Sequence, residues 1–171
     1  MTSPIRDAVA ADAGGIAEIY NDAVAHTTAI WNEQKVDAAD HVAWIEGRQT
    51  SGYPVLVAVD PADDVLGYAS FGPWRPHDGY RHTAEHSVYV RGDQRGRGIG
   101  EALLRAAIAR ARETGIHVMV GAIEAGNTGS LRLHEKLGFA RIGTMPQVGM
   151  KFGRWLDLAL LQLTLDDRPN P

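Results

Sequence analysis

The chain contains no cysteine in its 171 residues. A disulfide scaffold, a thiolate zinc site and a cysteine nucleophile are therefore excluded. The chain also lacks an apolar run long enough to span a bilayer, and its N-terminus lacks the apolar core of a signal peptide. We therefore expect a cytoplasmic protein with no membrane partner.

The sequence has no excess of positive charge. Seventeen basic residues against twenty-one acidic ones give a net charge of −4, which argues against nucleic acid as a partner. Against this acidic background, a basic cluster at residues 91–97 stands out. The chain shows no repeat or linker, so we expect one domain over residues 1–165 and a C-terminal tail over residues 166–171.

The stretch from Val88 to Glu101 reads as a strand, a glycine-rich turn and the start of a helix. Gly96, Gly98 and Gly100 lie in the turn, where glycine permits positive φ and close approach of a ligand. The free N–H groups and dipole of a helix start attract anions, and two arginines add charge. We interpret the turn as a pyrophosphate site, with an ordinary solvated turn as the alternative.

Two common phosphate motifs do not fit this turn. A P-loop needs Gly-Lys-Ser/Thr, but Glu101 follows the last glycine. A Rossmann fingerprint needs a third glycine where this chain has Glu101 or Leu103.

The hydrophobic pattern predicts a mixed central sheet flanked by helices, an α/β (α+β) sandwich. Asp12 is expected to cap the first helix, and Asp37 or Asp40 the second. The segment 143–153 is predicted to be a loop. We expect about four helices and about seven strands, the strands near residues 5–9, 55–59, 65–71, 83–90, 117–124, 139–142 and 155–165.

Two motifs resemble those of the GNAT N-acetyltransferases. Arg95-x-x-Gly98-x-Gly100 is similar to the acyl-CoA signature of that family, and Asn127 followed by residues 130–139 is similar to its second motif. The predicted order of elements also matches the GNAT fold from end to end.

The resemblance narrows to the phosphinothricin and methionine sulfoximine acetyltransferases. Residues 72–75, 83–90 and 149–157 carry it. It implies transfer of an acetyl group from acetyl-CoA to the α-amino group of a small L-amino acid or analogue, by direct attack within a ternary complex, and a homodimer. Methionine sulfone, methionine sulfoximine and phosphinothricin are the implied acceptors. The alternatives are acetylation of peptide or protein N-termini and a non-catalytic acyl-CoA-binding module.

Acyl transfer to an amine benefits from a base, because a free α-amino group has a pKa near ~8. Glu85 shares a strand face with Ser87 and Tyr89, and the resemblance implies the base role for it. The alternative is an ion pair with Arg75 or Arg81.

The leaving thiolate needs a proton, and many GNAT enzymes place a tyrosine on the second-motif helix for this purpose. This chain has His134 at that position, as the amino-acid N-acetyltransferases that it resembles also do, and we expect His134 to be the catalytic acid. The alternative is a packed histidine that bonds a nearby carbonyl.

An acceptor carboxylate needs a cation, and arginine suits it best. The expected acceptor-binding residues are Arg75, Pro76, His77, Arg81, Glu85, His86 and Ser87. Lys151 and the 143–153 segment are expected to close this pocket, either in their own subunit or in the partner subunit. The three histidines at 77, 82 and 86 are spaced too loosely for a metal site, so no metal is expected.

The resemblance implies that the predicted strand at residues 83–90 diverges from the one at residues 117–124 and admits the pantetheine arm between them. The expected acetyl-CoA-binding residues are Val88, Tyr89, Val90, Arg95, Gly96, Arg97, Gly98, Ile99, Gly100, Glu101, Asn127 and Lys136. Asn127 is expected to cap its helix, to bond the arm, or both.

Overall fold

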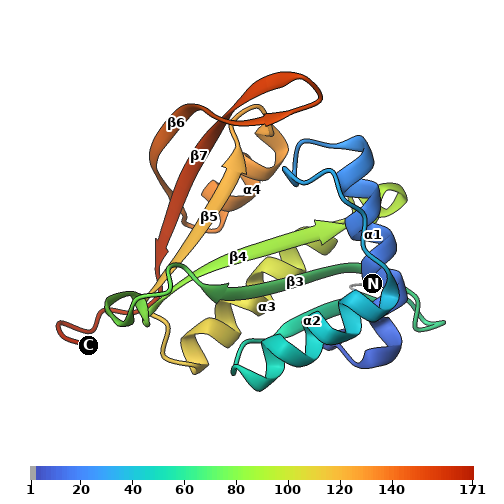
Figure 1. Ribbon diagram of the computed structural model, residues 1–171. Helices are drawn as coiled ribbons and strands as arrows, with labels where there is room; N and C mark the ends of the chain where they lie inside the picture. Colours follow the sequence, from blue (N-terminus) through green and yellow to red (C-terminus); the bar gives the residue numbers. More distant parts are fainter. Residues whose placement is uncertain (1–2) are drawn as a thin grey trace.

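The computed structural model describes residues 3–171 as one seven-stranded mixed sheet with helices on both faces (Figure 1). The strand order is β1-β2-β3-β4-β5-β7-β6. The predicted fold class is therefore confirmed. The elements are β1 (Ile5–Asp7), α1 (Ala13–His26), α2 (Ala38–Thr50), β2 (Val55–Val59), β3 (Val65–Pro73), β4 (Thr83–Val90), α3 (Ile99–Glu113), β5 (Val118–Glu124), α4 (Thr128–Lys136), β6 (Ala140–Lys151) and β7 (Arg154–Thr164).

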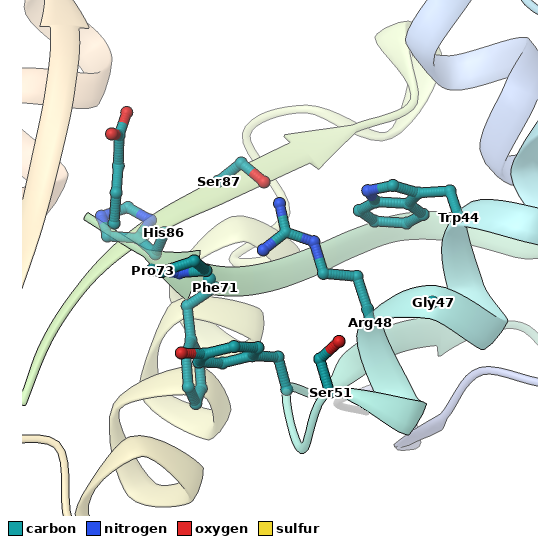
Figure 2. Close-up of a pocket in the computed structure, with 11 residues that line it drawn as sticks. Trp44, Gly47, Arg48, Ser51, Phe71, Pro73, His86 and Ser87 are labelled. Atoms are coloured by element: carbon teal, nitrogen blue, oxygen red, sulfur yellow. The ribbon is translucent and has the colours of Figure 1, made fainter. Parts of the chain in front are cut away.

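The sheet separates two apolar cores. All five residues of β2 are buried, and they alternate between the cores: Leu56 and Ala58 pack with α3, whereas Val55, Val57 and Val59 pack with α1 and α2. This continuous apolar run is typical of a strand covered on both faces. The C-terminal half of α2, which carries Trp44 and Arg48, faces β3 and β4 (Figure 2).

Strands β4 and β5 diverge along their length. Their parallel pairing covers only Thr83–Glu85 against Val118–Val120, although β4 continues to Val90 and β5 to Glu124 (Figure 1). The hydrogen bonds from Trp74 N–H to the Thr83 carbonyl and from Arg91 N–H to the Leu66 carbonyl (3.2 and 2.9 Å) direct the odd-numbered residues of β4 toward β3. The backbone groups of Val88 and Val90 therefore face the gap between β4 and β5.

The prediction of a loop over residues 143–153 was wrong. Strand β6 extends to Lys151 and pairs with β7, and only the two-residue turn Phe152–Gly153 separates them. Both turn residues have positive φ (50° and 69°), which suits a tight hairpin. Register shifts at Arg141/Gly143 and Met145/Gly149 accommodate the glycines and the proline that made this strand look like a loop.

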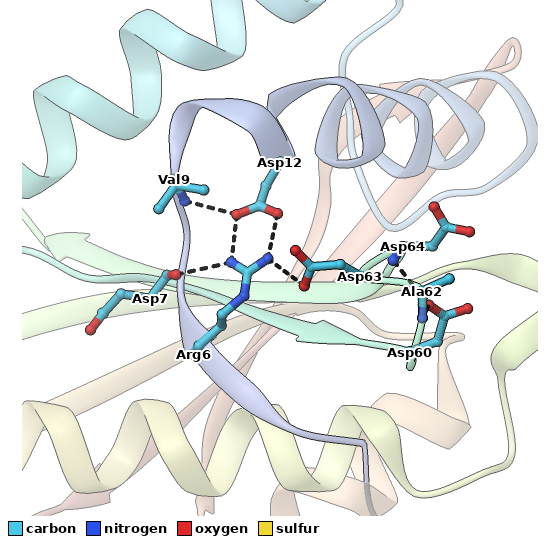
Figure 3. Close-up of polar contacts among 8 residues, drawn as sticks. All are labelled: Arg6, Asp7, Val9, Asp12, Asp60, Ala62, Asp63 and Asp64. Carbon is cyan, nitrogen blue, oxygen red and sulfur yellow. Dashed lines mark hydrogen bonds and ion pairs between the residues drawn. The ribbon is translucent and has the colours of Figure 1, made fainter.

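An arginine anchors the N-terminal strand to the start of α1. Arg6 makes a two-pronged ion pair with buried Asp12 (2.7 and 2.9 Å) and a third bond to Asp63 of the β2–β3 turn (Figure 3). Asp12 also accepts from the Val9 N–H (2.8 Å) and makes no side-chain cap bond to α1, contrary to the prediction. Asp37, one of the two candidates, does cap α2.

We expect Arg6→Ala to lower the free energy of unfolding at neutral pH by about 2–3 kcal/mol. This is less than the ~3–5 kcal/mol for a fully buried pair because a third of the Arg6 side chain is exposed. Burial opposes the charged form of Asp12, but the Arg6 and Val9 hydrogen bonds outweigh it and lower its pKa. The stability that the Arg6–Asp12 pair supplies is therefore present above the ordinary aspartate pKa. It is lost as pH falls through the lowered pKa of Asp12 in the folded protein. Urea unfolding at several pH values checks this. Arg91→Ala is the control: Arg91 forms an exposed pair with Asp93, so this substitution should leave the midpoint of urea unfolding nearly unchanged.

None of the helices in residues 3–171 is both long and apolar enough to cross a membrane.

Candidate active site

Two cavities meet at consecutive residues of β4. One, the α2 pocket, has a volume of about 650 Å³ and reaches β4 at Glu85–Ser87 (Figure 2). The other, the splay cleft, has a volume of about 930 Å³ and reaches β4 at Val88–Val90. The divergence of β4 and β5 creates this second cavity, because it removes the neighbour that would otherwise fill the space.

The glycine-rich turn forms one wall of the splay cleft. Gly96 and Gly98 have φ of +76° and +80°, a conformation that glycine adopts without strain. Gly98 is the N-cap of α3, and the first α3 bond runs from Ala102 N–H to the Gly98 carbonyl (3.0 Å). The N–H groups of residues 99–101 therefore have no partner within the helix. The turn lines a large cavity, as the pyrophosphate interpretation requires.

Most of the residues expected to bind acetyl-CoA lie along this cleft. The expected residues that line it are Val88, Tyr89, Val90, Arg95, Gly96, Gly98, Ile99, Gly100, Glu101 and Asn127. Asn127 also accepts from the Ser130 N–H (3.2 Å), so its capping of α4 is confirmed.

Two of the expected residues are not part of the cleft lining. The Arg97 guanidinium bonds the Gln94 side chain. The Lys136 ammonium lies 2.6 Å from Glu101 Oε2, so it partly neutralises the one carboxylate at the start of α3.

Glu85 is the carboxylate of the α2 pocket. It is half-buried, and burial raises its pKa above the usual glutamate value, while the charges of Arg75 and Arg48 oppose this rise. These arginines act through their charge alone, without a hydrogen bond to the carboxylate. No ion pair joins Glu85 to Arg75 or Arg81 among the pairs of the described chain. The carboxylate is thus available to a ligand in the pocket.

The cation of the α2 pocket is Arg48, which was not among the residues expected from the sequence. Its guanidinium carbon lies 5.9 Å from the centre of the Trp44 ring, one helical turn earlier. A side chain at position 72 would overlap the guanidinium, so Gly72 leaves the space that Arg48 fills. Figure 2 shows Arg48 extending from α2 toward Ser87 of β4. The only signal in the sequence was the spacing of four between Trp44 and Arg48.

The loop between β3 and β4 holds four of the expected acceptor-binding residues away from the α2 pocket. Arg75, Pro76, His77 and Arg81 are exposed and line neither cavity. The Arg75 guanidinium stacks 4.7 Å above the Trp74 ring, and Arg81 donates to the Asp78 carbonyl (3.1 Å). Within residues 3–171, no three histidine or acidic side chains gather as a metal site.

His134 is buried and bonded at both ring nitrogens. Its Nδ1 lies 2.7 Å from the Ser130 carbonyl, which can only accept, so Nδ1 carries the proton. Its Nε2 therefore accepts from the Nε2–H of His86, 3.0 Å away. Burial lowers the pKa of both rings, that of His86 to about 3. His134 does not line the splay cleft, and this arrangement is the packed histidine that was the alternative to a general acid.

Lys151 is not positioned to close either cavity, contrary to expectation. It is buried, and its ammonium donates to the carbonyls of Thr27 (2.6 Å) and Ile30 (2.5 Å). The charge lies at the C-terminal end of α1, where the helix dipole favours a cation. Lys151 thereby ties β6 to the segment that follows α1, of which residues 27–29 line the splay cleft.

The fold places two cavities end to end along one strand, β4. Residues 16–139 match the acetyltransferase (GNAT) family. The chain belongs to this family and is an acetyltransferase, so the resemblance in the sequence is confirmed.

Relatives cover nearly the whole chain. An L-methionine sulfoximine/L-methionine sulfone acetyltransferase from Pseudomonas aeruginosa is 62% identical over 97% of this chain and 96% of its own length. An L-amino acid N-acyltransferase from Escherichia coli is 57% identical over 98% of this chain and 96% of its own. A phosphinothricin N-acetyltransferase from Alcaligenes faecalis is 37% identical over 91% and 79%.

A solved structure has the same fold over its full length. The yncA protein of Salmonella typhimurium, solved with its cofactor acetyl-CoA, has a TM-score of 0.96 and 53% identity, covering 100% of this chain and 98% of its own.

Proposed function

We propose that the protein transfers an acetyl group from acetyl-CoA to the α-amino group of methionine sulfone, methionine sulfoximine or a similar small amino acid. The meeting of the two cavities on β4 carries this proposal, because Glu85 lines one and Val88 lines the other. The choice of acceptor is supported by the relative named for methionine sulfoximine and methionine sulfone and by the relative named for L-amino acids.

The splay cleft suits acetyl-CoA at both ends. The free N–H groups at the start of α3 and the Arg95 guanidinium suit a diphosphate. The backbone groups of Val88 and Val90 suit the amides of a pantetheine arm. Bound acetyl-CoA supplies the thioester that the amine attacks.

Glu85 is the proposed general base. The acceptor enters the α2 pocket, and Glu85 takes a proton from its ammonium group directly or through a water, which frees the nitrogen lone pair. The amine forms the new C–N bond as the C–S bond breaks and the coenzyme A thiolate departs. The nitrogen then loses its second proton, which leaves an amide, and this proton neutralises the thiolate. Because both nitrogens of His134 are engaged within the protein, we assign it no proton transfer. The loop that carries Arg75, Pro76 and His77 is proposed to contact the acceptor only at the rim of the α2 pocket.

The proposed compartment is the cytoplasm, where acetyl-CoA and free amino acids are both present. The proposed assembly is a homodimer. Large apolar side chains are exposed on the β6–β7 hairpin, and a second copy of the chain is proposed to cover them. They are Ile142, Met145, Val148, Met150, Phe152 and Trp155.

Trp155→Arg is expected to convert the dimer to a monomer, because Trp155 is 68% exposed in the single chain and a charge there would be buried at the interface. Sedimentation equilibrium measures the mass. An unchanged dimer would contradict the proposed interface, whereas a monomeric wild type would contradict the dimer itself.

Release of thiol from acetyl-CoA tests the function, with mass spectrometry of the acetylated product. Methionine sulfone, methionine sulfoximine, phosphinothricin and short peptides with free N-termini serve as acceptors. Turnover of the free amino acids without the peptides supports the proposal. Turnover of the peptides alone would replace it with N-terminal acetylation. Coenzyme A binding without turnover of any amine would identify a binding module.

A further inference from the structure

We propose that Arg48 binds the α-carboxylate of the acceptor and thereby restricts the enzyme to free amino acids. This proposal rests on the proposed function and adds a specificity-determining residue to it.

Arg48 is a cation without a polar partner in the described chain. Most other arginines donate to a carboxylate, a carbonyl or a side-chain oxygen, as Arg6, Arg91, Arg105, Arg110 and Arg168 do. The remaining arginines without such a bond, at positions 75, 95, 132 and 154, are exposed to water, whereas Arg48 is partly buried. Burial lowers the pKa of Arg48, so the charged guanidinium is less favoured there than in water, and a ligand carboxylate would offset this effect.

The fold makes room for this guanidinium. At position 72 any side chain would meet it, and glycine is the residue there. The Trp44 ring flanks the guanidinium at 5.9 Å. Gly72 is also the residue of β3 that pairs with Glu85 of β4. The space occupied by the Arg48 head therefore lies beside the strand position that carries the proposed base.

The two charges of the pocket match the two charges of an α-amino acid. The ammonium and carboxylate of a free amino acid are attached to the same carbon, so both must bind within a short distance of each other. Glu85 and Arg48 line one cavity and have opposite charge. Burial raises the pKa of the first and lowers that of the second, so a zwitterion placed between them would satisfy both. A guanidinium also binds a carboxylate through two parallel bonds.

The other candidate cations lie outside this cavity. The charge of Arg75 also opposes the raised pKa of Glu85, so Arg75 lies near the pocket, but its side chain is exposed, stacks on Trp74 and does not line the cavity. Arg81 bonds its own loop. The geometry therefore favours Arg48 over the two arginines expected from the sequence.

Two acceptors that differ only in the carboxylate test the assignment. Methionine sulfone is compared with 3-(methylsulfonyl)propylamine, its decarboxylated form, for the wild type, Arg48→Gln, Arg48→Lys, Arg75→Gln and the control Arg132→Gln. Arg132 is exposed on α4 and lines neither cavity. The measured quantity is the ratio of kcat/KM for the two acceptors, since comparing this ratio between variants cancels the difference in amine basicity.

We expect Arg48→Gln to lower kcat/KM for methionine sulfone about 10- to 100-fold, in keeping with a charge-assisted hydrogen bond. The decarboxylated amine should change less than about threefold. Arg48→Lys should retain part of the preference because the charge remains without the second bond. Arg132→Gln should match the wild type. Calorimetric binding of methionine sulfone should weaken in parallel, without any need for turnover.

Three results would overturn the assignment. An equal loss for both acceptors in Arg48→Gln would show a structural role. A loss of preference in Arg75→Gln but not in Arg48→Gln would transfer the role to Arg75. A wild type with no preference for the carboxylate would show that no residue has this role. A wild type that acetylates neither acceptor would instead contradict the proposed function, and the role of Arg48 with it.

Discussion

Glu85→Gln is expected to lower kcat by about 10²–10⁴-fold and to leave acetyl-CoA affinity unchanged. The substitution keeps the size of the side chain but removes the group that accepts the proton, and general base catalysis typically contributes this factor. Glu85 lines the α2 pocket and not the splay cleft, so the donor site should remain intact. Steady-state kinetics with methionine sulfone and calorimetry with coenzyme A measure the two quantities.

The pH profile separates a base from a binding group. Burial raises the pKa of Glu85, so the base form is lost as pH falls through a value above that of an ordinary glutamate. Wild-type kcat/KM should therefore rise as pH increases through the pKa of Glu85, whereas in Glu85→Gln the rise should follow only the α-amino group of the acceptor, near pH ~8. Glu113→Gln, at the exposed end of α3, is the control. Turnover within about threefold of the wild type in Glu85→Gln would remove Glu85 from the mechanism.

Gly98→Val is expected to raise KM for acetyl-CoA at least about tenfold, equal to ~1.4 kcal/mol of lost binding. Gly98 has φ of +80°, which a β-branched residue adopts only under strain of about 1–2 kcal/mol. Its added side chain would also project into open space at the head of the cleft. Both effects act on the N–H groups proposed to hold the diphosphate.

The same helix offers a matched control for this substitution. Gly115 follows the other end of α3 with φ of +77°, also has open space around it, and lines neither cavity. Gly115→Val should lower the unfolding temperature by a similar amount and leave KM unchanged. Equal KM values for the two variants would contradict a diphosphate site at the start of α3.

The central part of the fold was predictable because its signals are local. The strand residues Val88–Val90, the glycines and the helical spacing after Ile99 all lie within a short stretch. The glycine-rich turn therefore took its predicted form. Strand β6 was missed because Gly143, Pro146 and Gly149 look like loop residues. Only its pairing with β7, through two register shifts, makes it a strand.

The site was predictable where strand alternation determines it. Alternation placed Glu85 and Ser87 on one face, and both line the α2 pocket. It could not reveal that α2 lies over β3 and β4, so Arg48 was missed and the loop arginines were preferred. Likewise, the partner of His134 is His86, which is 48 residues away, and only the packing of α4 on the sheet brings the two rings together.

A crystal structure with coenzyme A and methionine sulfone bound tests the central claim most directly. We expect the diphosphate at the N–H groups of residues 96–101 and the thiol at the Val88–Val90 side of β4. The acceptor nitrogen should lie about 2.6–3.2 Å from the Glu85 carboxylate or from one water that bridges them. A nucleotide bound outside the gap between β4 and β5, or an acceptor nitrogen on the opposite face from Glu85, would contradict it.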